Sequence, residues 1–168
     1  MRRYFLPITA VLVVLAAGYA IWAGVSWLNS TTNDSVEFSR EREEVLRVGR
    51  VGLANFTTLD YKKVDEDLNR WLDSSTGDLR TEIESSRDGR KKQIEDAKTV
   101  TVSRVLDAAV TDLDARAGKA HLIAVVETTV TPDSGQSVKK VNRYQTDLTR
   151  TDAGWKLSAL GPVAAGGA

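Results

Sequence analysis

The feature that most constrains this chain is an uncharged, mostly apolar run near its start, FLPITAVLVVLAAGYAIWAGVSWL, Phe5–Leu28. A helix needs roughly 20 apolar residues to cross the hydrocarbon core of a bilayer, and this run is long enough. Tyr4, Trp22 and Trp27 lie toward its ends, where amphipathic aromatic rings favour the membrane–water interface. The run therefore predicts a transmembrane anchor at residues 5–28.

A cleaved signal peptide is the alternative, because AAGYA at residues 16–20 has the small side chains that signal peptidase accepts. The apolar run continues past the roughly 7–15 residues of a signal peptide's apolar region, which favours an uncleaved anchor. Arg2 and Arg3 precede the run, and such charges keep the preceding segment in the cytoplasm. We therefore expect residues 1–4 in the cytoplasm and the remainder of the chain in the periplasm or cell envelope.

Charge and cysteine content narrow the chemistry of the exported part. Arg2 and Arg3 are the only charges before the run ends, so the part after residue 28 has 21 of the 23 basic side chains and all 23 acidic ones. Phosphate recognition needs a clustered excess of cations, so we expect no nucleic acid partner. The chain has no cysteine, which excludes disulfides, thiolate catalysis and cysteine-type zinc sites.

After the run, the sequence predicts a short linker and then helices. NSTTNDS at residues 29–35 is small and polar, as linkers are. Three segments with helical spacing of apolar residues follow, at residues 36–56, 61–75 and 77–97. In the first of them, Gly49 and Gly52 lower helix propensity by about 1 kcal/mol each, which suggests that another backbone crosses closely there.

The stretch NFTTLDY, Asn55–Tyr61, joins the first two helical segments. Asp60 is suited to be the N-cap of the second helix, where a carboxylate accepts bonds from free backbone amides. Tyr61 then lies on the apolar face that includes Trp71. The acidic run Asp65–Asp67 resembles a metal-binding group, but consecutive helical positions point in different directions, so a solvated helix face is expected.

From Lys98 onward the apolar period changes from 3.6 to 2, which predicts four strands joined by tight turns, at residues 99–112, 119–131, 138–151 and 155–161. Helices followed by a meander of strands define an α+β class, with a curved four-stranded antiparallel sheet and the helices packed on one face. The apolar faces predicted for the first two strands consist of Val100, Val102, Leu106, Ala108, Val110, Ala120, Leu122, Ala124, Val126 and Val130. The other face should meet water. We place the domain at residues 36–163 and a disordered Ala- and Gly-rich tail at 164–168.

The order of these motifs resembles that of the Mce-associated membrane proteins of actinobacteria. The resemblance depends on the anchor, NFTTLDY, the pair Asp65 and Asp67, WLDSSTGDLRTEI (71–83) and GWKLSAL (154–160). Leu79 departs from it, since an aromatic residue is expected there. The resemblance implies a cystatin-like or SnoaL-like cone domain and a role beside Mce lipid-import systems.

Enzymes of this cone fold, such as ketosteroid isomerase, need a carboxylate base inside the cone. The inward strand faces here are Val, Ala, Leu and Thr, whereas Asp107, Glu127 and Asp147 fall on the opposite parity. His121, the one histidine of the chain, also falls there and excludes multi-histidine metal sites. We therefore expect no enzymatic activity, no cofactor and no metal.

We expect the domain to act by contact. Arg143, Gln145, Asp147 and Thr149 form a mixed polar row on the third strand, and charges of both signs favour a specific, complementary partner. Structural roles are expected for Asp60, Tyr61, Trp71 and Trp155.

The sequence thus predicts a non-enzymatic accessory or scaffold subunit of an Mce-type lipid or sterol import complex, with Mce proteins and other Mce-associated subunits as partners. The alternatives are a lipid-binding module that passes cargo, and a scaffold of another envelope machine resembling type IV secretion.

Overall fold

The computed structural model describes residues 5–163, and in its first helix it describes side chains at residues 18–24 and from 35 onward. The predicted cytoplasmic N-terminus at 1–4 and the predicted tail at 164–168 lie outside the described residues. The chain divides into two compact units, Met1–Arg40 and Glu41–Ala168. The sheet and the candidate site belong to the second unit.

Helix α1 spans Phe5–Thr57. Residues 29–35, predicted as a linker, are therefore helical. The segment contains neither glycine nor proline, the two residues that disfavour a helix most. Among the helices of the described residues, none combines the length and the apolar character needed to cross a membrane. Side chains at residues 5–17 and 25–28, most of the predicted anchor, lie outside the description, and the anchor stays a prediction.

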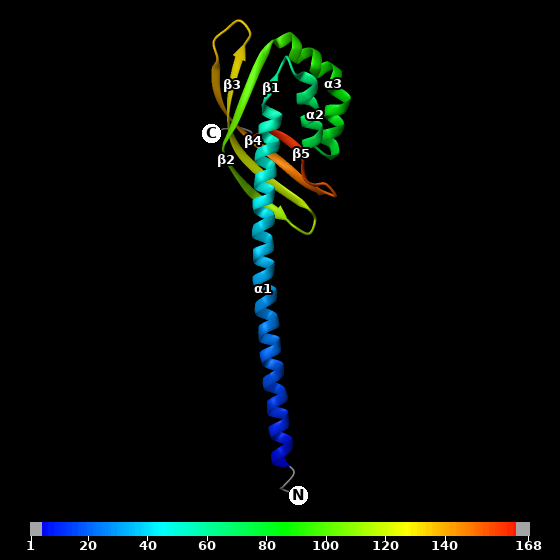
Figure 1. Ribbon diagram of the computed structural model, residues 1–168, viewed down its shortest axis with the longest axis vertical. Coiled ribbons are helices and arrows are strands. Elements are labelled where there is room, and N and C mark those ends of the chain that lie inside the picture. Colours follow the sequence, from blue (N-terminus) through cyan, green and yellow to red (C-terminus); the bar gives the residue numbers. More distant parts are fainter. Residues whose placement is uncertain (1–4, 164–168) are drawn as a thin grey trace. The chain divides into compact units, whose positions relative to one another are not determined.

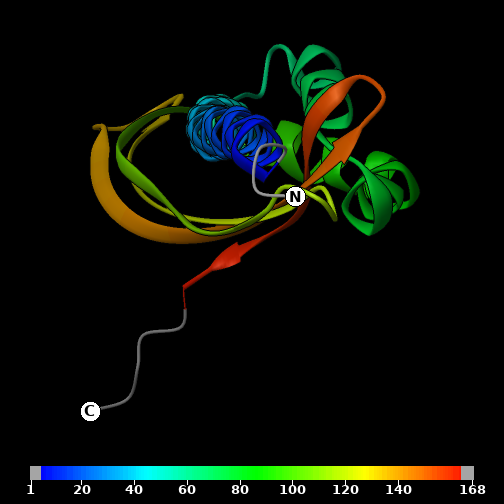
Figure 2. The same cartoon turned by 90° about the horizontal axis from the view of Figure 1, so that it is seen from below.

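Within residues 5–163, five strands form one antiparallel sheet in sequence order. They are β1 (Leu59–Asp60), β2 (Thr99–Asp114), β3 (Lys119–Pro132), β4 (Val138–Thr151) and β5 (Gly154–Pro162). The long strands bend strongly, so the sheet is curled (Figure 1, Figure 2). The predicted α+β class with a curved antiparallel sheet is confirmed. The sequence missed β1, because two residues are too short to show a period.

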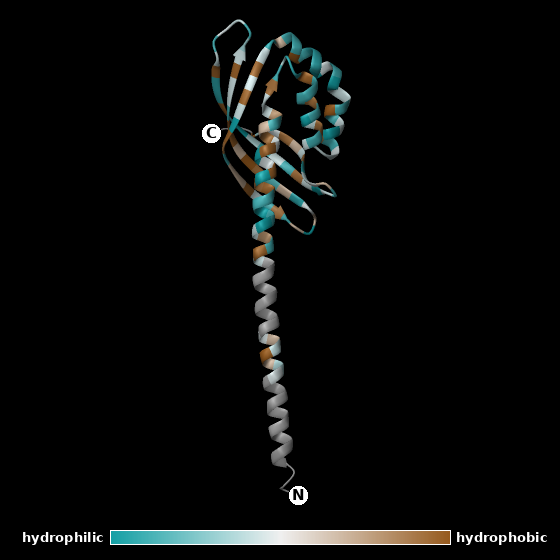
Figure 3. Cartoon of the chain, in the orientation of Figure 1, coloured by the Kyte–Doolittle hydropathy of each residue, from teal (hydrophilic) through white to brown (hydrophobic). Residues whose placement is uncertain are grey.

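The alternation of buried and exposed residues is confirmed in β3 and is partly wrong in β2. Apolar and polar bands alternate along the strands (Figure 3). In β2, however, Val102 and Leu106 are 58% and 41% exposed, although they were predicted to face inward. The register of β2 against β3 shifts between Val105 and Asp107 and again after Val110. A β-bulge adds one residue and exchanges the two faces, so the residues before the first bulge have the opposite parity to Ala108 and Val110.

The C-terminal part of α1 fills the concave side of the curled sheet. Val45 and Leu53 of α1 are fully buried in a cluster with inward residues of the strands, including Leu122 and Leu157. A Cβ added at Gly49 would lie 2.7 Å from Leu122 Cδ1, and one at Gly52 would collide with Leu157 Cδ1. The two glycines therefore accommodate leucine side chains of β3 and β5. The predicted close crossing is present, but it involves side chains and not a backbone.

This contact gives a prediction with a matched control. Gly52→Ala should destabilise the domain, because overpacking against a fully buried leucine costs about 1–3 kcal/mol and outweighs the gain in helix propensity of about 1 kcal/mol. Gly89→Ala, in the middle of α3 (Gly77–Ala97), adds a methyl group where nothing lies within 4 Å and should stabilise. Urea unfolding of both variants measures the two signs. Stabilisation by Gly52→Ala would contradict this packing.

Helices α2 (Val64–Ser74) and α3 form a second cluster with the end of α1. Trp71 lies at its centre, 9% exposed, stacked on Phe56 with ring centroids 5.5 Å apart. Its indole Nε1 donates a hydrogen bond to the carbonyl oxygen of Asn55 at 3.0 Å. Trp71 thus joins α2 to the NFTTLDY stretch, which supports the structural role predicted for it.

Asp60 does not cap α2, so that prediction is wrong. The helix begins at Val64 with Lys63 at the N-cap, and no side chain accepts a capping hydrogen bond there. Asp60 lies in β1, and its Oδ1 accepts from the backbone nitrogen of Lys62 at 2.9 Å. A local turn between β1 and α2 intervenes, which moves the helix start four residues downstream of the aspartate. Tyr61 donates to Asp133 at 2.7 Å, and this hydrogen bond raises the pKa of the Tyr61 phenol.

The acidic run Asp65–Asp67 is not a uniformly solvated face. Asp67 is 1% exposed, and its Oδ2 accepts from the backbone nitrogen of Asp60 at 2.6 Å. Its other carboxylate oxygen accepts from Arg70. Asp65 is exposed and bonds to Lys91 of α3 at 2.6 Å. One carboxylate therefore holds the turn before α2, and the other holds α2 against α3.

Trp155 is buried at the start of β5, as expected of a structural residue. The Arg150 guanidinium lies over its ring, 5.7 Å from the ring centroid. Arg150 also pairs with Glu41 of α1 and donates to the carbonyl oxygen of Ala115 at 2.6 Å. These contacts join α1, the β2–β3 turn and β5.

Candidate interaction surface

The predicted polar row lies on the convex, outward face of the sheet. Arg143, Gln145 and Asp147 are exposed and Thr149 is half-buried, while the intervening Thr146 and Leu148 are buried. The residues of the row lie opposite outward residues of β3: Val125 pairs with Arg143, Ile123 with Gln145, His121 with Asp147 and Lys119 with Thr149. The structure thus brings the four predicted residues together on one face.

Half of this row is bonded within the chain. His121 Nδ1 lies 2.5 Å from Asp147 Oδ1, and Lys119 Nζ donates to Thr149 Oγ1 at 2.9 Å. The side chains of Arg143 and Gln145 have no hydrogen-bond or ion-pair partner in the described part of the chain. Arg143 therefore remains available to a group from outside the chain.

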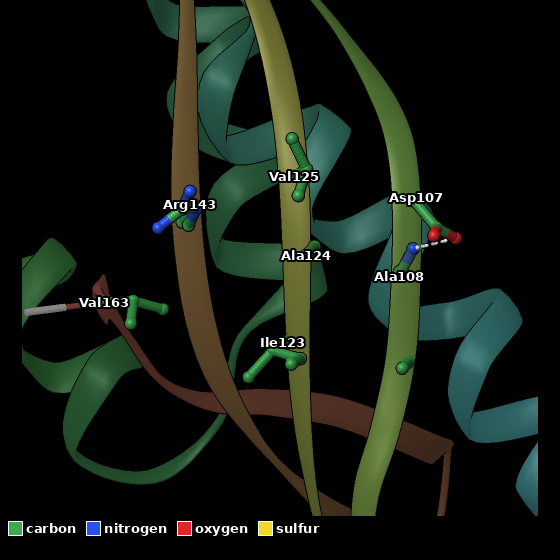
Figure 4. Close-up of a pocket in the computed structure, with 8 residues that line it drawn as sticks. Asp107, Ala108, Ile123, Ala124, Val125, Arg143 and Val163 are labelled. Carbon is green, nitrogen blue, oxygen red and sulfur yellow. Dashed lines mark hydrogen bonds between the residues drawn. The ribbon is translucent and has the colours of Figure 1, made fainter. Parts of the chain in front are cut away.

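Sequence reasoning missed an apolar area beside Arg143. A shallow pocket of 190 Å³ lies over β2, β3 and β4, and Figure 4 shows Ile123 and Val125 between Asp107 on one side and Arg143 and Val163 on the other. We call the outward side chains of this pocket the central patch, namely Asp107, Ala109, Ile123, Val125, Arg143 and Val163. Ile123 is 42% exposed. An exposed apolar area with a polar rim is typical of a contact surface.

The signal for this area was present in the sequence. Residues 122–126 of β3, LIAVV, are apolar at both parities. A strand that is apolar on both faces is typical of a sheet whose two faces are both buried. In a strand with one face in water, apolar and polar residues alternate. The inward half of this run, Leu122, Ala124 and Val126, is covered by the core. Nothing in the described chain covers Ile123, which leaves the outward half for a partner.

The interior of the curled sheet offers little room for a ligand, because α1 occupies it. The pockets found around the domain are open and small. One of 260 Å³ lies between Trp71, Ile94 and Thr99, and one of 230 Å³ lies between Val51, Asp73 and Lys156. Sites for small molecules usually have about 300–1,000 Å³. Both volumes lie below this range.

The free edge of β2 is protected against pairing with another strand. Arg42 of α1 donates to the carbonyl oxygen of Val110 at 3.2 Å, and Arg50 donates to that of Val105 at 3.5 Å. The two β-bulges lie at the same positions. Bulges and charged side chains are common protections of edge strands. The outward face, not this edge, is therefore the better candidate for contact.

The carboxylates considered for catalysis lie outside the cone. Asp107 and Asp147 are exposed, and Glu127 lies within 3.8 Å of both Arg104 and Lys139 on the outward face. Within the described residues, no cluster of three or more His, Cys, Asp and Glu side chains is arranged to hold a metal ion.

Solved domains of type IV secretion proteins superpose on this curled antiparallel sheet and its helices. An IcmL-like type IV secretion system protein from Legionella pneumophila superposes with a TM-score of 0.59 at 10% identity, covering 76% of this chain and 96% of that one. The periplasmic domain of DotI gives 0.58 at 12%, covering 71% and 94%. CagV, a VirB8 homologue of the type IV secretion system from Helicobacter pylori, gives 0.53 at 10%, covering 71% and 95%. These likenesses concern the fold.

The chain belongs to the Rv1363c/MT1408-like protein family, whose model matches residues 6–163. It is 25% identical over 154 residues to the uncharacterized protein Rv1363c of Mycobacterium tuberculosis. The match covers 90% of this chain and 57% of the mycobacterial protein.

Proposed function

We propose that this chain is a membrane-anchored scaffold subunit of a cell-envelope machine and that it acts by contact through the outward face of its sheet. The observation with the greatest weight is the central patch, where exposed apolar side chains lie beside an arginine without an internal partner. The likeness to periplasmic domains of secretion systems is consistent with this role.

The machine that we propose is an Mce-type lipid or sterol import complex. The support is the arrangement of the anchor, the NFTTLDY stretch and the terminal GWKLSAL strand, which resembles that of Mce-associated membrane proteins. A machine related to type IV secretion is the second candidate, and it is supported by the fold likeness alone. Proteins that copurify from the native membrane would distinguish the two.

A cargo-carrying role is less well supported. A lipid-binding cone needs an empty interior, whereas Gly49 and Gly52 allow Leu122 and Leu157 to fill the space beside α1.

A non-enzymatic role is supported by the environment of Asp67, since this buried carboxylate already accepts hydrogen bonds from Asp60 and Arg70.

The proposed topology has the N-terminus in the cytoplasm and the domain in the envelope, with the anchor at residues 5–28. Protease added to intact spheroplasts should then digest the domain and spare the N-terminus. Protection of the domain would overturn this orientation. A soluble mature form would restore the signal-peptide alternative.

The contact surface is tested by placing a charge on the central patch. Ile123→Asp in the full-length chain should reduce the recovery of partner proteins several-fold in mild detergent, because an unpaired carboxylate in an apolar contact is costly. Val102→Asp is the matched control, since Val102 is also an exposed apolar residue of the sheet but lies outside the patch. Mass spectrometry of the purified complexes gives the recovery. Equal recovery with both variants would contradict the proposed surface.

A further inference from the structure

We propose that the central patch binds the same patch of a second copy of this chain, so that the subunit enters its machine as a pair. The inference rests on the proposed function, because it names a partner for the same surface. It starts from one lateral row of the sheet. The register places Asp107 on β2 beside Val125 on β3, and Val125 beside Arg143 on β4.

The charges of this row make the patch complementary to itself. Asp107 and Arg143 lie on the two sides of β3 (Figure 4), and neighbouring strands are about 4.8 Å apart. A two-fold axis along β3 places Arg143 of each copy opposite Asp107 of the other, and Val125 opposite Val125. A two-fold axis across the strands would place like charges opposite each other, which is unfavourable. The charges of this row therefore favour the first arrangement.

Two other carboxylates of this face are already bonded inside the chain. Glu127 lies within 3.8 Å of Arg104 and Lys139, and Asp147 bonds to His121. Arg143 has no such partner among the described residues, and the one hydrogen bond of the Asp107 side chain there is to the backbone nitrogen that follows it. The fold thus leaves available both of the groups that a second copy would pair in this row.

The apolar part of the patch supplies the burial for this contact. Ile123 and Val125 lie on β3 itself, at the proposed axis, and Ala109 and Val163 lie beside them. Facing sheets pack about 10 Å apart with such side chains between them. Because the face is convex, the contact area is small, and small interfaces are weak or transient. Two chains held in one membrane gain effective concentration, which makes a weak contact sufficient.

The absence of cysteine allows a direct test in native membranes. Full-length Val125→Cys should give a covalent dimer with a short bismaleimide, because the two introduced thiols face each other at the axis. Val51→Cys is the matched control, since Val51 is 53% exposed but lies on α1, on the other side of the sheet. Dimer formation by Val125→Cys no greater than that of the control would overturn the proposal.

Charge reversal tests the predicted pairing in the Val125→Cys chain. Arg143→Asp and Asp107→Arg should each reduce the dimer roughly ten-fold, because each creates two like-charge contacts, and the double variant should restore it. Unchanged dimer in the single variants, or no restoration in the double, would overturn the proposal.

The test separates this inference from the proposed function. Without a dimer but with loss of partner proteins in Ile123→Asp, the self-association is wrong and the scaffold role stands. If the dimer forms but Ile123→Asp recovers its partner proteins normally, the self-association stands and the proposed scaffold role is wrong.

Discussion

Replacing Trp71 with alanine is expected to lower the free energy of unfolding of the domain by about 3–5 kcal/mol. The substitution removes a buried indole from the centre of the α2–α3 cluster, its stacking on Phe56 and its hydrogen bond to the carbonyl oxygen of Asn55. Urea unfolding of the full-length chain in detergent, followed by circular dichroism, measures the change.

Trp71→Phe is the control for this prediction. It keeps an aromatic ring against Phe56 but cannot donate to Asn55, so the loss should be smaller than that of the alanine variant. If both variants were as stable as the parent chain, the cluster would not hold α2 to the end of α1 as the structure places it.

Replacing Asp67 with alanine is expected to lower the free energy of unfolding by about 1–3 kcal/mol. The substitution leaves the backbone nitrogen of Asp60 without its acceptor in a half-buried site, and it frees Arg70. The local effect should be a mobile β1–α2 turn, visible as faster amide hydrogen exchange at residues 60–63. Unchanged exchange there would contradict the role assigned to Asp67.

Asp65→Asn is the matched control, because Asp65 lies two residues away on the same helix but is exposed. Its ion pair with Lys91 is a surface pair, and such pairs contribute little to stability, so this variant should unfold at nearly the same urea concentration as the parent chain.

The Lys91 hydrogen bond holds the pKa of Asp65 below its ordinary value. Any stabilisation from this pair is therefore present above the ordinary pKa of an aspartate and is lost as the pH falls through the lower folded value.

The sequence was most informative where structure depends on near neighbours. Helical spacing from Thr76 or Gly77 to about Ala97 predicted α3, which spans Gly77–Ala97. Alternation in β3 predicted the buried set from Ala120 to Val126. These patterns are local, since a helix or a strand repeats every few residues. The polar row at Arg143 and Gln145 was found for the same reason.

The sequence was least informative where the outcome depends on a distant partner. The first bulge of β2, between Val105 and Asp107, exchanged its faces, so that Val102 and Leu106 are exposed. This bulge is defined only by the register against β3. Asp60 was assigned to a cap because its true partners, Lys62 and Asp67, meet it only once the turn has formed. Asp67 shares a helical face with the buried residues Val64 and Trp71, and this spacing indicates that Asp67 is buried too. The neighbouring acidic residues favoured the opposite prediction, a solvated face.

By itself, the sequence determined the class of the protein: an uncharged run before a cysteine-free α+β domain with a small acidic excess, with helices ahead of a meander of strands. Only the tertiary structure decided that leucines from β3 and β5 pack against Gly49 and Gly52. It also decided that Ile123 is exposed and Val125 half-buried between Asp107 and Arg143. The physical reason is that periodicity assigns a residue to a face of its own element. Which faces become covered depends on how elements far apart in the chain pack together.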